Sequence, residues 1–166
     1  MKKIFFFLLL FSISVIFCFT GCNKDNSSSA SYIKGKVDGV AFETNSNMWA
    51  TPGAAGDKII SFRGDWSGWS IRFYLDGQGS NITTGSYDFV TGMVRNAVIY
   101  ENNDGYSAGY FCGGLAPCSY SGSGKIIITD ISKKLIRGTF EFVTDVNGAT
   151  GVSKNVTNGE FYMKRD

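Results

Sequence analysis

The chain of 166 residues contains no histidine, and this absence excludes several classes of chemistry at once. Catalytic triads that use an imidazole as general base are excluded, as are nearly all zinc and copper sites with a histidine ligand. No phosphate-binding loop of the GxxxxGK[ST] type occurs, and the glycines of residues 105–114 precede no predicted helix, so they form no dinucleotide fingerprint. We therefore expect neither nucleotide chemistry nor a bound cofactor.

Proline and net charge are also scarce. Only two prolines accompany 21 glycines, which is typical of a chain with many turns and bulges. Lys2 and Lys3 account for the whole formal net charge of +2, so the rest of the chain carries acidic and basic residues in equal number. This balance gives no reason to expect a nucleic-acid partner.

Long apolar runs are absent except near the N-terminus. There, two lysines precede an apolar run over residues 4–17, and Phe19-Thr20-Gly21 leads to Cys22. The run is shorter than the roughly 20 residues of a membrane-spanning helix and is typical of a cleaved signal peptide. This segment resembles the signal of bacterial lipoproteins, in which the cysteine is acylated on its thiol and becomes the new N-terminus. It differs from the usual pattern in having Phe19 where leucine is common.

The resemblance implies a signal peptide over residues 1–21 and lipidation at Cys22. The alternatives are an uncleaved anchor or an ordinary signal that is cut elsewhere. Two or more acyl chains would hold the protein stably on a membrane. Residues 22–31 are polar after the cysteine, so we expect a flexible lipidated tether.

The tether also carries a possible sorting signal. Lys24-Asp25 resembles the short charged signal that sends some lipoproteins of the Bacteroidota to the outer face of the outer membrane, although Asn26 stands where a second acid is usual. Ordinary solubilising residues are the alternative interpretation. We expect a lipid-anchored protein of the bacterial cell envelope, on the outer membrane, either surface-exposed or periplasmic.

Cysteine is sparse beyond the signal. Cys18 would leave with the signal peptide and Cys22 would carry lipid, so Cys112 and Cys118 remain. An exported domain lies where disulfides persist, and the glycines and the proline between these two cysteines allow them to approach. We predict a disulfide that contributes about 2 kcal/mol, since the loop it closes is short. The spacing does not fit the CxxC motif of redox or zinc sites.

Apolar and polar residues alternate along most of the remaining chain, which predicts β-strands. The clearest strand is Trp69–Asp76, whose apolar side chains fall on one face and polar ones on the other. Residues 136–143 alternate in the same way and are expected to pair with residues 125–131. Further strands are predicted at residues 32–37, 40–43, 58–63, 86–89, 97–101, 105–111 and 156–163, and residues 46–50 could form a short strand or a turn.

About nine or ten strands are too many for one open sheet to bury well, so two packed sheets are expected. We predict a single all-β domain over residues 32–166, an antiparallel β-sandwich. A flattened β-barrel is the alternative, because it needs the same alternation. No stretch shows the pattern of an amphipathic helix.

Four segments also resemble a known group of proteins. They are VDGVAF at residues 37–42, GKIIITD at 124–130, IRGTFEF at 136–142 and VTNGEF at 156–161. These segments are similar to a group of small uncharacterised lipoproteins of the Bacteroidota. The resemblance implies a single secreted β domain and supplies no activity or catalytic residues.

Carboxylates offer two further chemistries. Asp65, Asp88, Glu101 and Asp104 lie near aromatic residues in the sequence, and two facing acids could cleave a glycosidic bond without histidine. Oxygen ligands for calcium cluster at residues 101–104, and again at Asp145 with Asn147, but neither segment is an EF-hand loop. Asn and Asp are also common in tight turns, so we predict no metal site and no enzymatic activity.

Aromatic residues are the main positive indication of function, at 15% of the chain. We select Trp49, Trp66 and Tyr74 as candidate ligand-stacking residues, since such rings offer a large contact area at small entropic cost. Packing within the sheet is the alternative, and Trp69, on the apolar face of its strand, is predicted to belong to the core. Other candidates for stacking are Tyr106, Tyr110 and Tyr120.

These observations favour a non-enzymatic module that binds a glycan or another envelope protein. We expect the lipid on Cys22 to attach this module to the membrane. A structural or accessory subunit of an envelope complex is the alternative. A carboxylate-based hydrolase is the third hypothesis.

Overall fold

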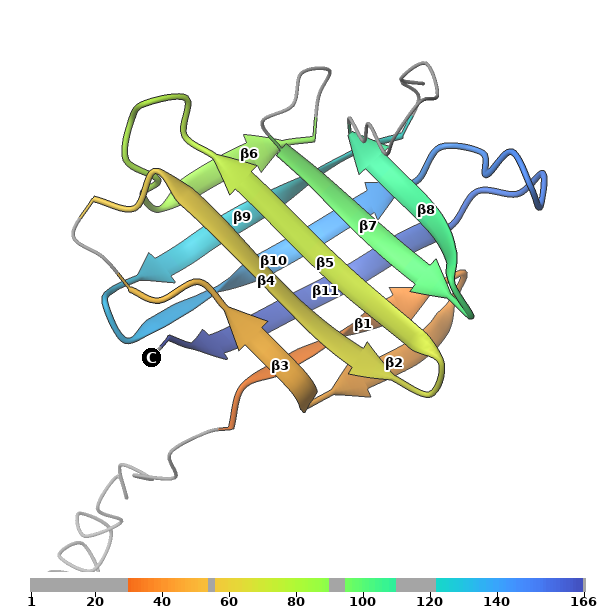
Figure 1. The fold of residues 1–166 in the computed structure, drawn as a ribbon, viewed down its shortest axis with the longest axis horizontal. Helices are drawn as coiled ribbons and strands as arrows, with labels where there is room; N and C mark the ends of the chain where they lie inside the picture. Colours follow the sequence, from red (N-terminus) through yellow and green to blue (C-terminus); the bar gives the residue numbers. More distant parts are fainter. Residues whose placement is uncertain (1–29, 54–55, 90–94, 110–121, 166) are drawn as a thin grey trace, which may run out of the picture.

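The computed structural model describes residues 30–53, 56–89, 95–109 and 122–165 (Figure 1). Within these ranges the secondary structure consists of β-strands joined by turns and loops. The strands are β1 (Tyr32–Val37), β2 (Val40–Thr44), β3 (Ser46–Ala50), β4 (Ile59–Trp66), β5 (Trp69–Asp76), β6 (Gly85–Asp88), β7 (Arg95–Glu101), β8 (Asp104–Gly109), β9 (Ser123–Ile131), β10 (Leu135–Val143) and β11 (Asn155–Lys164). The described part of the chain contains no helix with the length and hydrophobicity needed to cross a membrane.

The strands form two antiparallel sheets that lie face to face. The six-stranded sheet has the order β2-β1-β11-β10-β9-β6, and the five-stranded sheet has the order β3-β4-β5-β7-β8. In Figure 1 the strands of the five-stranded sheet cross in front of those of the other sheet. The sheets do not close on each other, so the predicted antiparallel β-sandwich is confirmed and the barrel alternative is not.

The described part of the chain forms eleven strands, where about nine or ten were expected. Residues 46–50, for which a turn was also considered, form strand β3. Strand β4 continues beyond Arg63 to Trp66, where it turns into β5 through Ser67 and Gly68, with φ angles of 35° and 81°. Positive φ at both turn positions is typical of a two-residue hairpin. Sequence patterning missed the end of β4 because glycine and aspartate, at positions 64 and 65, are disfavoured in strands.

Phenylalanine side chains from both sheets fill the space between them. Phe62 and Phe73 of the five-stranded sheet stack at a centroid distance of 4.8 Å. Across the sandwich, the ring centroid of Phe62 lies 4.7 Å from that of Phe161, and the ring centroid of Phe73 lies 4.7 Å from that of Phe140. All four side chains are at most 3% exposed. The core thus contains an aromatic cluster that holds the two sheets together, surrounded by buried aliphatic side chains.

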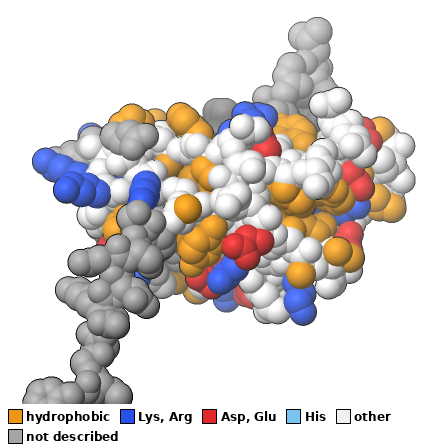
Figure 2. Space-filling model, turned by 90° about the horizontal axis from the view of Figure 1, so that it is seen from below, with side chains coloured by type: hydrophobic (Ala, Val, Ile, Leu, Met, Phe, Trp, Pro, Cys, Tyr) orange, Lys and Arg blue, Asp and Glu red, His pale blue; other side chains and the backbone are white. Residues whose placement is uncertain are grey.

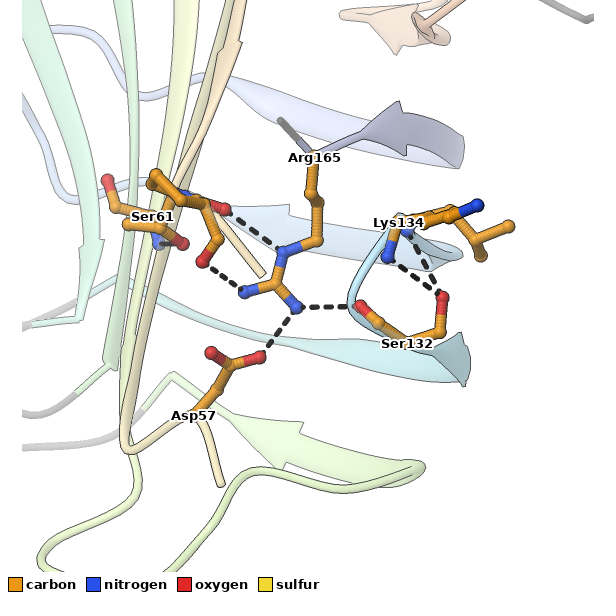
Figure 3. Close-up of polar contacts among 8 residues, drawn as sticks. Asp57, Ser61, Ser132, Lys134 and Arg165 are labelled. Carbon is orange, nitrogen blue, oxygen red and sulfur yellow. Dashed lines mark hydrogen bonds and ion pairs between the residues drawn. The ribbon is translucent and has the colours of Figure 1, made fainter. Parts of the chain in front are cut away.

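A buried arginine ties three parts of the chain together at one end of the sandwich (Figure 3). The fully buried guanidinium of Arg165 lies 2.6 Å from Oδ2 of Asp57. It also donates to the backbone carbonyls of Thr51 (3.0 Å), Pro52 (3.1 Å) and Ser132 (3.2 Å). Arg165 therefore fastens the C-terminal end of β11 to the β3–β4 and β9–β10 connections, a role that sequence patterning did not reveal.

Candidate ligand-binding site

A groove with a volume of about 590 Å³ lies on the outer face of the five-stranded sheet, next to the β4–β5 turn. We call it the outer groove. Its lining includes charged, hydroxyl, amide and aromatic groups from three strands and a turn, namely Arg63, Asp65, Ser70, Arg72, Tyr100 and Asn103. This volume falls in the usual range for small-ligand sites, roughly 300–1,000 Å³.

The strand register brings these side chains together. Asp65 on β4 lies opposite Ser70 on β5, which lies opposite Tyr100 on β7. One row further along the sheet, Arg63 lies directly opposite Arg72. Successive side chains of a strand point to opposite faces, so these residues point away from the core, which receives the alternate residues.

Charge is distributed unevenly in the outer groove. Nη2 of Arg63 lies 2.5 Å from Oδ2 of Asp65, whereas Oδ1 of Asp65 is buried without a hydrogen-bond partner in the described structure. Arg72 stacks on Tyr100, with its guanidinium carbon 4.9 Å from the ring centroid. Among the described residues, Arg72 has no carboxylate partner. The groove is therefore lined by two guanidinium groups and one carboxylate, and the carboxylate contacts Arg63 alone.

Two of the three predicted stacking residues lie on the same outer face as the groove. Trp49 on the edge strand β3 is opposite Arg63, and its side chain is 50% exposed. Tyr74 lies on the outer face of β5, two residues beyond Arg72, and is partly buried. The structure thus brings Trp49 and Tyr74 to the surface that contains the outer groove.

The third predicted residue, Trp66, lies in a stack of aromatic rings at the end of the sandwich. Its ring is nearly parallel to Phe42, at a centroid distance of 4.4 Å and an angle of 9°. Trp69 lies 6.0 Å away at 13°. Trp66 lines the outer groove, but the ring face that contacts Phe42 is covered.

The prediction that Trp69 belongs to the core needs correction. Trp69 is only partly buried and packs against the edge of the core. It begins β5 directly after the β4–β5 turn, at the end of the sandwich, where a smaller pocket of about 220 Å³ opens beside it. A side chain on the apolar face of a strand is fully covered only where the opposite sheet extends over it, and the alternation alone does not show where that sheet ends.

Lys154 holds this end of the sandwich together. Its ammonium lies 2.9 Å from Oε2 of Glu101 and 3.7 Å from Oδ2 of Asp38. It also lies 5.1 Å from the ring centroid of Trp69 and 5.0 Å from that of Tyr106. The hydrogen bond to Glu101 is the largest of the causes that raise the pKa of Lys154 above its usual value. Tyr106, considered above for stacking on a ligand, is buried and contacts Lys154 instead.

The candidate catalytic acids do not gather in one cleft. Asp65 lines the outer groove, whereas Asp88 ends β6 in the other sheet. Glu101 pairs with the ammonium of Lys154, and Asp104 is exposed beside the β7–β8 turn. Of the four acids, Asp65 alone contributes to the outer groove.

The candidate calcium segments serve as turns. Asn102 and Asn103 have φ angles of 48° and 82° and connect β7 to β8 as a tight hairpin. The side-chain oxygen of Asn147 accepts hydrogen bonds from the backbone of Ala149 (2.7 Å) and Thr150 (3.1 Å). Over the described ranges, no group of three or more Cys, Asp or Glu side chains could hold a metal ion.

Several predicted residues lie outside the described parts of the chain. These are Cys22, Cys112, Cys118, Tyr110 and Tyr120. Lipidation at Cys22 and the disulfide between Cys112 and Cys118 therefore stay predictions.

Sequence reasoning missed the charged half of the outer groove, namely Arg63 and Arg72, and also Tyr100. One signal was present, because Arg72 and Tyr74 both fall on the polar face of the predicted strand Trp69–Asp76. Which residues of neighbouring strands face Arg72 depends on register, and register cannot be read from one strand alone.

A family model described as a domain of unknown function, DUF6252, matches residues 29–163. Comparisons with curated proteins and with solved structures found no match. The match agrees with the expected resemblance to uncharacterised proteins. The lipoprotein signal and an origin in the Bacteroidota stay predictions.

Proposed function

We propose that this chain, which belongs to the DUF6252 family, is an envelope lipoprotein of the Bacteroidota whose β-sandwich binds a glycan in the outer groove without enzymatic activity. One observation carries the proposal: two aromatic side chains, one exposed and one partly buried, lie on the same outer face as a groove lined by charged and hydroxyl groups. Trp49 and Tyr74 share the outer face of the five-stranded sheet with Arg63, Asp65 and Arg72.

This combination of groups matches the chemistry of a sugar. A sugar ring has apolar faces, on which an aromatic ring can pack, and a rim of hydroxyl groups that donate and accept hydrogen bonds. Arg63 and Arg72 supply donors at the groove, while Asp65 supplies an acceptor. The side chain of Asp65 is 21% exposed although its Oδ1 is buried, so Oδ2, which also contacts Arg63, is the oxygen that would accept from a sugar hydroxyl.

The dispersed hydrophobic surface favours a glycan over a docked protein subunit. On the face seen in Figure 2, hydrophobic side chains lie in several separate patches with charged side chains between them. Large exposed hydrophobic residues of the described chain lie on both sheets, as Val40 on β2 and Ile59 on β4 illustrate. A docking surface for an envelope complex would be supported by one contiguous apolar patch of several hundred Å².

The lipid anchor would hold the groove near a membrane. A tether of the length of residues 23–31 has a root-mean-square reach of about 16 Å as a flexible coil. A glycan bound in the outer groove would therefore be kept close to the outer membrane, on its outer or its periplasmic side.

Replacing the anchor residue tests the location. We expect Cys22→Ala to move the protein from the membrane fraction to the soluble fraction, since the acyl chains attach through that thiol. Mass spectrometry of the wild-type protein should find acyl mass on a peptide that begins at Cys22. A Cys22→Ala variant that still sediments with membranes would contradict lipid anchoring.

A glycan array probed with the full chain in detergent tests the binding function. We expect at least one class of glycan to bind, and we expect Trp49→Ala and Tyr74→Ala each to weaken that binding about tenfold, since each removes a stacking ring. Tyr162→Ala is the matched control, because Tyr162 lies in the six-stranded sheet and stacks on Tyr32. Absence of binding to every glycan, or an equal loss in the Tyr74 and Tyr162 variants, would refute the assignment.

A further inference from the structure

We infer that the outer groove selects acidic glycans, which carry carboxylate or sulfate groups, and that Arg72 binds the anionic group. The inference rests on the proposed glycan-binding function and adds the class of ligand to it. It is carried by the arrangement of charges in the groove.

The groove contains a pair of like charges. Arg63 and Arg72 are directly opposite each other on β4 and β5, an arrangement that destabilises an antiparallel sheet. The carboxylate of Asp65 offsets one of these charges, through its contact with Arg63. Arg72 has no such partner within the described residues, so the groove keeps an excess positive charge. An anionic group bound beside Arg72 would supply the missing partner.

Arg72 is also held in a suitable orientation. Its guanidinium lies over the ring of Tyr100, and stacking on a ring leaves the N–H edge of the guanidinium free to donate. Tyr100 in turn lies beside Gly105 on β8, where a Cβ atom would come within 3.2 Å of the tyrosine Cε1. The ring thus occupies the space above a glycine. An exposed guanidinium held in this way can bind a carboxylate or sulfate through two parallel hydrogen bonds.

The experiment compares acidic and neutral sugars. The full chain in detergent is titrated with an oligomer of galacturonic acid, with a galactose oligomer of the same length, and with that galactose oligomer after sulfation. We expect at least one acidic oligomer to bind about tenfold or more tightly than the neutral one, since hydrogen bonds between charged groups are the strongest available in the groove. The preference should decrease as sodium chloride is raised, because salt screens the attraction. Comparison of the two acidic oligomers shows whether carboxylate or sulfate is the preferred group.

Two arginine variants make the test specific. Arg72→Gln should abolish the preference for the acidic oligomer, so that the acidic oligomer binds no more than about twofold more tightly than the neutral one. Arg137→Gln removes the same charge from the outer face of the other sheet, where Arg137 pairs with Asp130 at 3.1 Å, and should keep the preference. Arg72→Lys retains the positive charge but lacks the planar guanidinium that makes two parallel hydrogen bonds, so it should keep part of the preference for the acidic oligomer. The thermal unfolding of Arg72→Lys and of Arg72→Gln, each compared with that of the unchanged protein, separates loss of binding from loss of fold.

The outcomes separate the two proposals. Equal binding of acidic and neutral oligomers, or an equal effect of Arg72→Gln and Arg137→Gln, overturns the acidic preference and leaves glycan binding in place. Absence of binding to all three oligomers and to the whole glycan array overturns both.

Discussion

Arg165→Met is expected to lower the free energy of unfolding by about 3–5 kcal/mol, the typical cost of removing one partner of a buried ion pair. The methionine removes a fully buried guanidinium from its contact with Asp57, whose side chain is only 8% exposed. It also leaves the backbone carbonyls of Thr51, Pro52 and Ser132 without the donors that Arg165 provides. Since small domains are stable by about 5–15 kcal/mol in total, this single change would remove much of the stability.

Urea denaturation of the full chain in detergent measures this effect. Lys164→Met is the matched control, because Lys164 is adjacent in the sequence but exposed, and we expect it to change stability by less than about 0.5 kcal/mol. The double variant Asp57→Asn with Arg165→Met should be more stable than Arg165→Met alone, since it removes the buried charge that the single change leaves behind. A loss below about 1 kcal/mol for Arg165→Met would show that the ion pair does not stabilise this end of the sandwich.

The sequence predicted those features of the fold that follow from the residue pattern within a single strand. The alternation of Trp69–Asp76 and of residues 136–143 is confirmed, with Phe73, Phe140 and Phe142 buried. Each of these strands has one face against the other sheet and one face toward solvent, so burial imposes a period of two on the sequence. The same period indicated an antiparallel sandwich.

Features that depend on several distant segments were not predicted. Arg165 directly follows the last strand, and its partner Asp57 is 108 residues away in the sequence. The outer groove likewise depends on the register that places Arg72 between Arg63 on one neighbouring strand and Val98 on the other. A slip of one residue would turn Arg72 away from both, and nothing in an isolated strand sets that alignment.

Trp49 and Tyr74 show how far prediction of the site could go. Their residue type suggested stacking, and the structure places both on one outer face. Trp66 has the same residue type but is stacked on Phe42, because β4 runs on to the end of the sandwich and points this ring inward. Residue type therefore identified the candidates. The face on which each side chain lies depends on where its strand ends, which residue type alone does not show.

Phe73→Ala is expected to reduce the free energy of unfolding by about 3–5 kcal/mol, the usual cost of truncating a buried phenylalanine. Phe73 is 1% exposed and lies 4.8 Å from Phe62 in its own sheet. It also contacts the opposite sheet, at centroid distances of 4.7 Å from Phe140 and 6.1 Å from Phe142. Alanine would leave a cavity bounded by aromatic rings of both sheets. The strands cannot move inward to close this cavity without breaking hydrogen bonds to their neighbours in the sheet.

Tyr74→Ala, at the next position of β5, is the matched control for this change. Tyr74 lies on the outer face and is partly buried, so its truncation should cost about 1 kcal/mol or less while it weakens glycan binding. Phe73→Leu fills more of the cavity than alanine and should recover part of the lost stability. Urea denaturation measures the stability of all three variants, and glycan titration measures their binding. A comparable loss of stability in Phe73→Ala and Tyr74→Ala would mean that the aromatic cluster does not hold the two sheets together. Separate effects on stability and on binding would instead show that adjacent residues of one strand serve the core and the ligand-binding face independently.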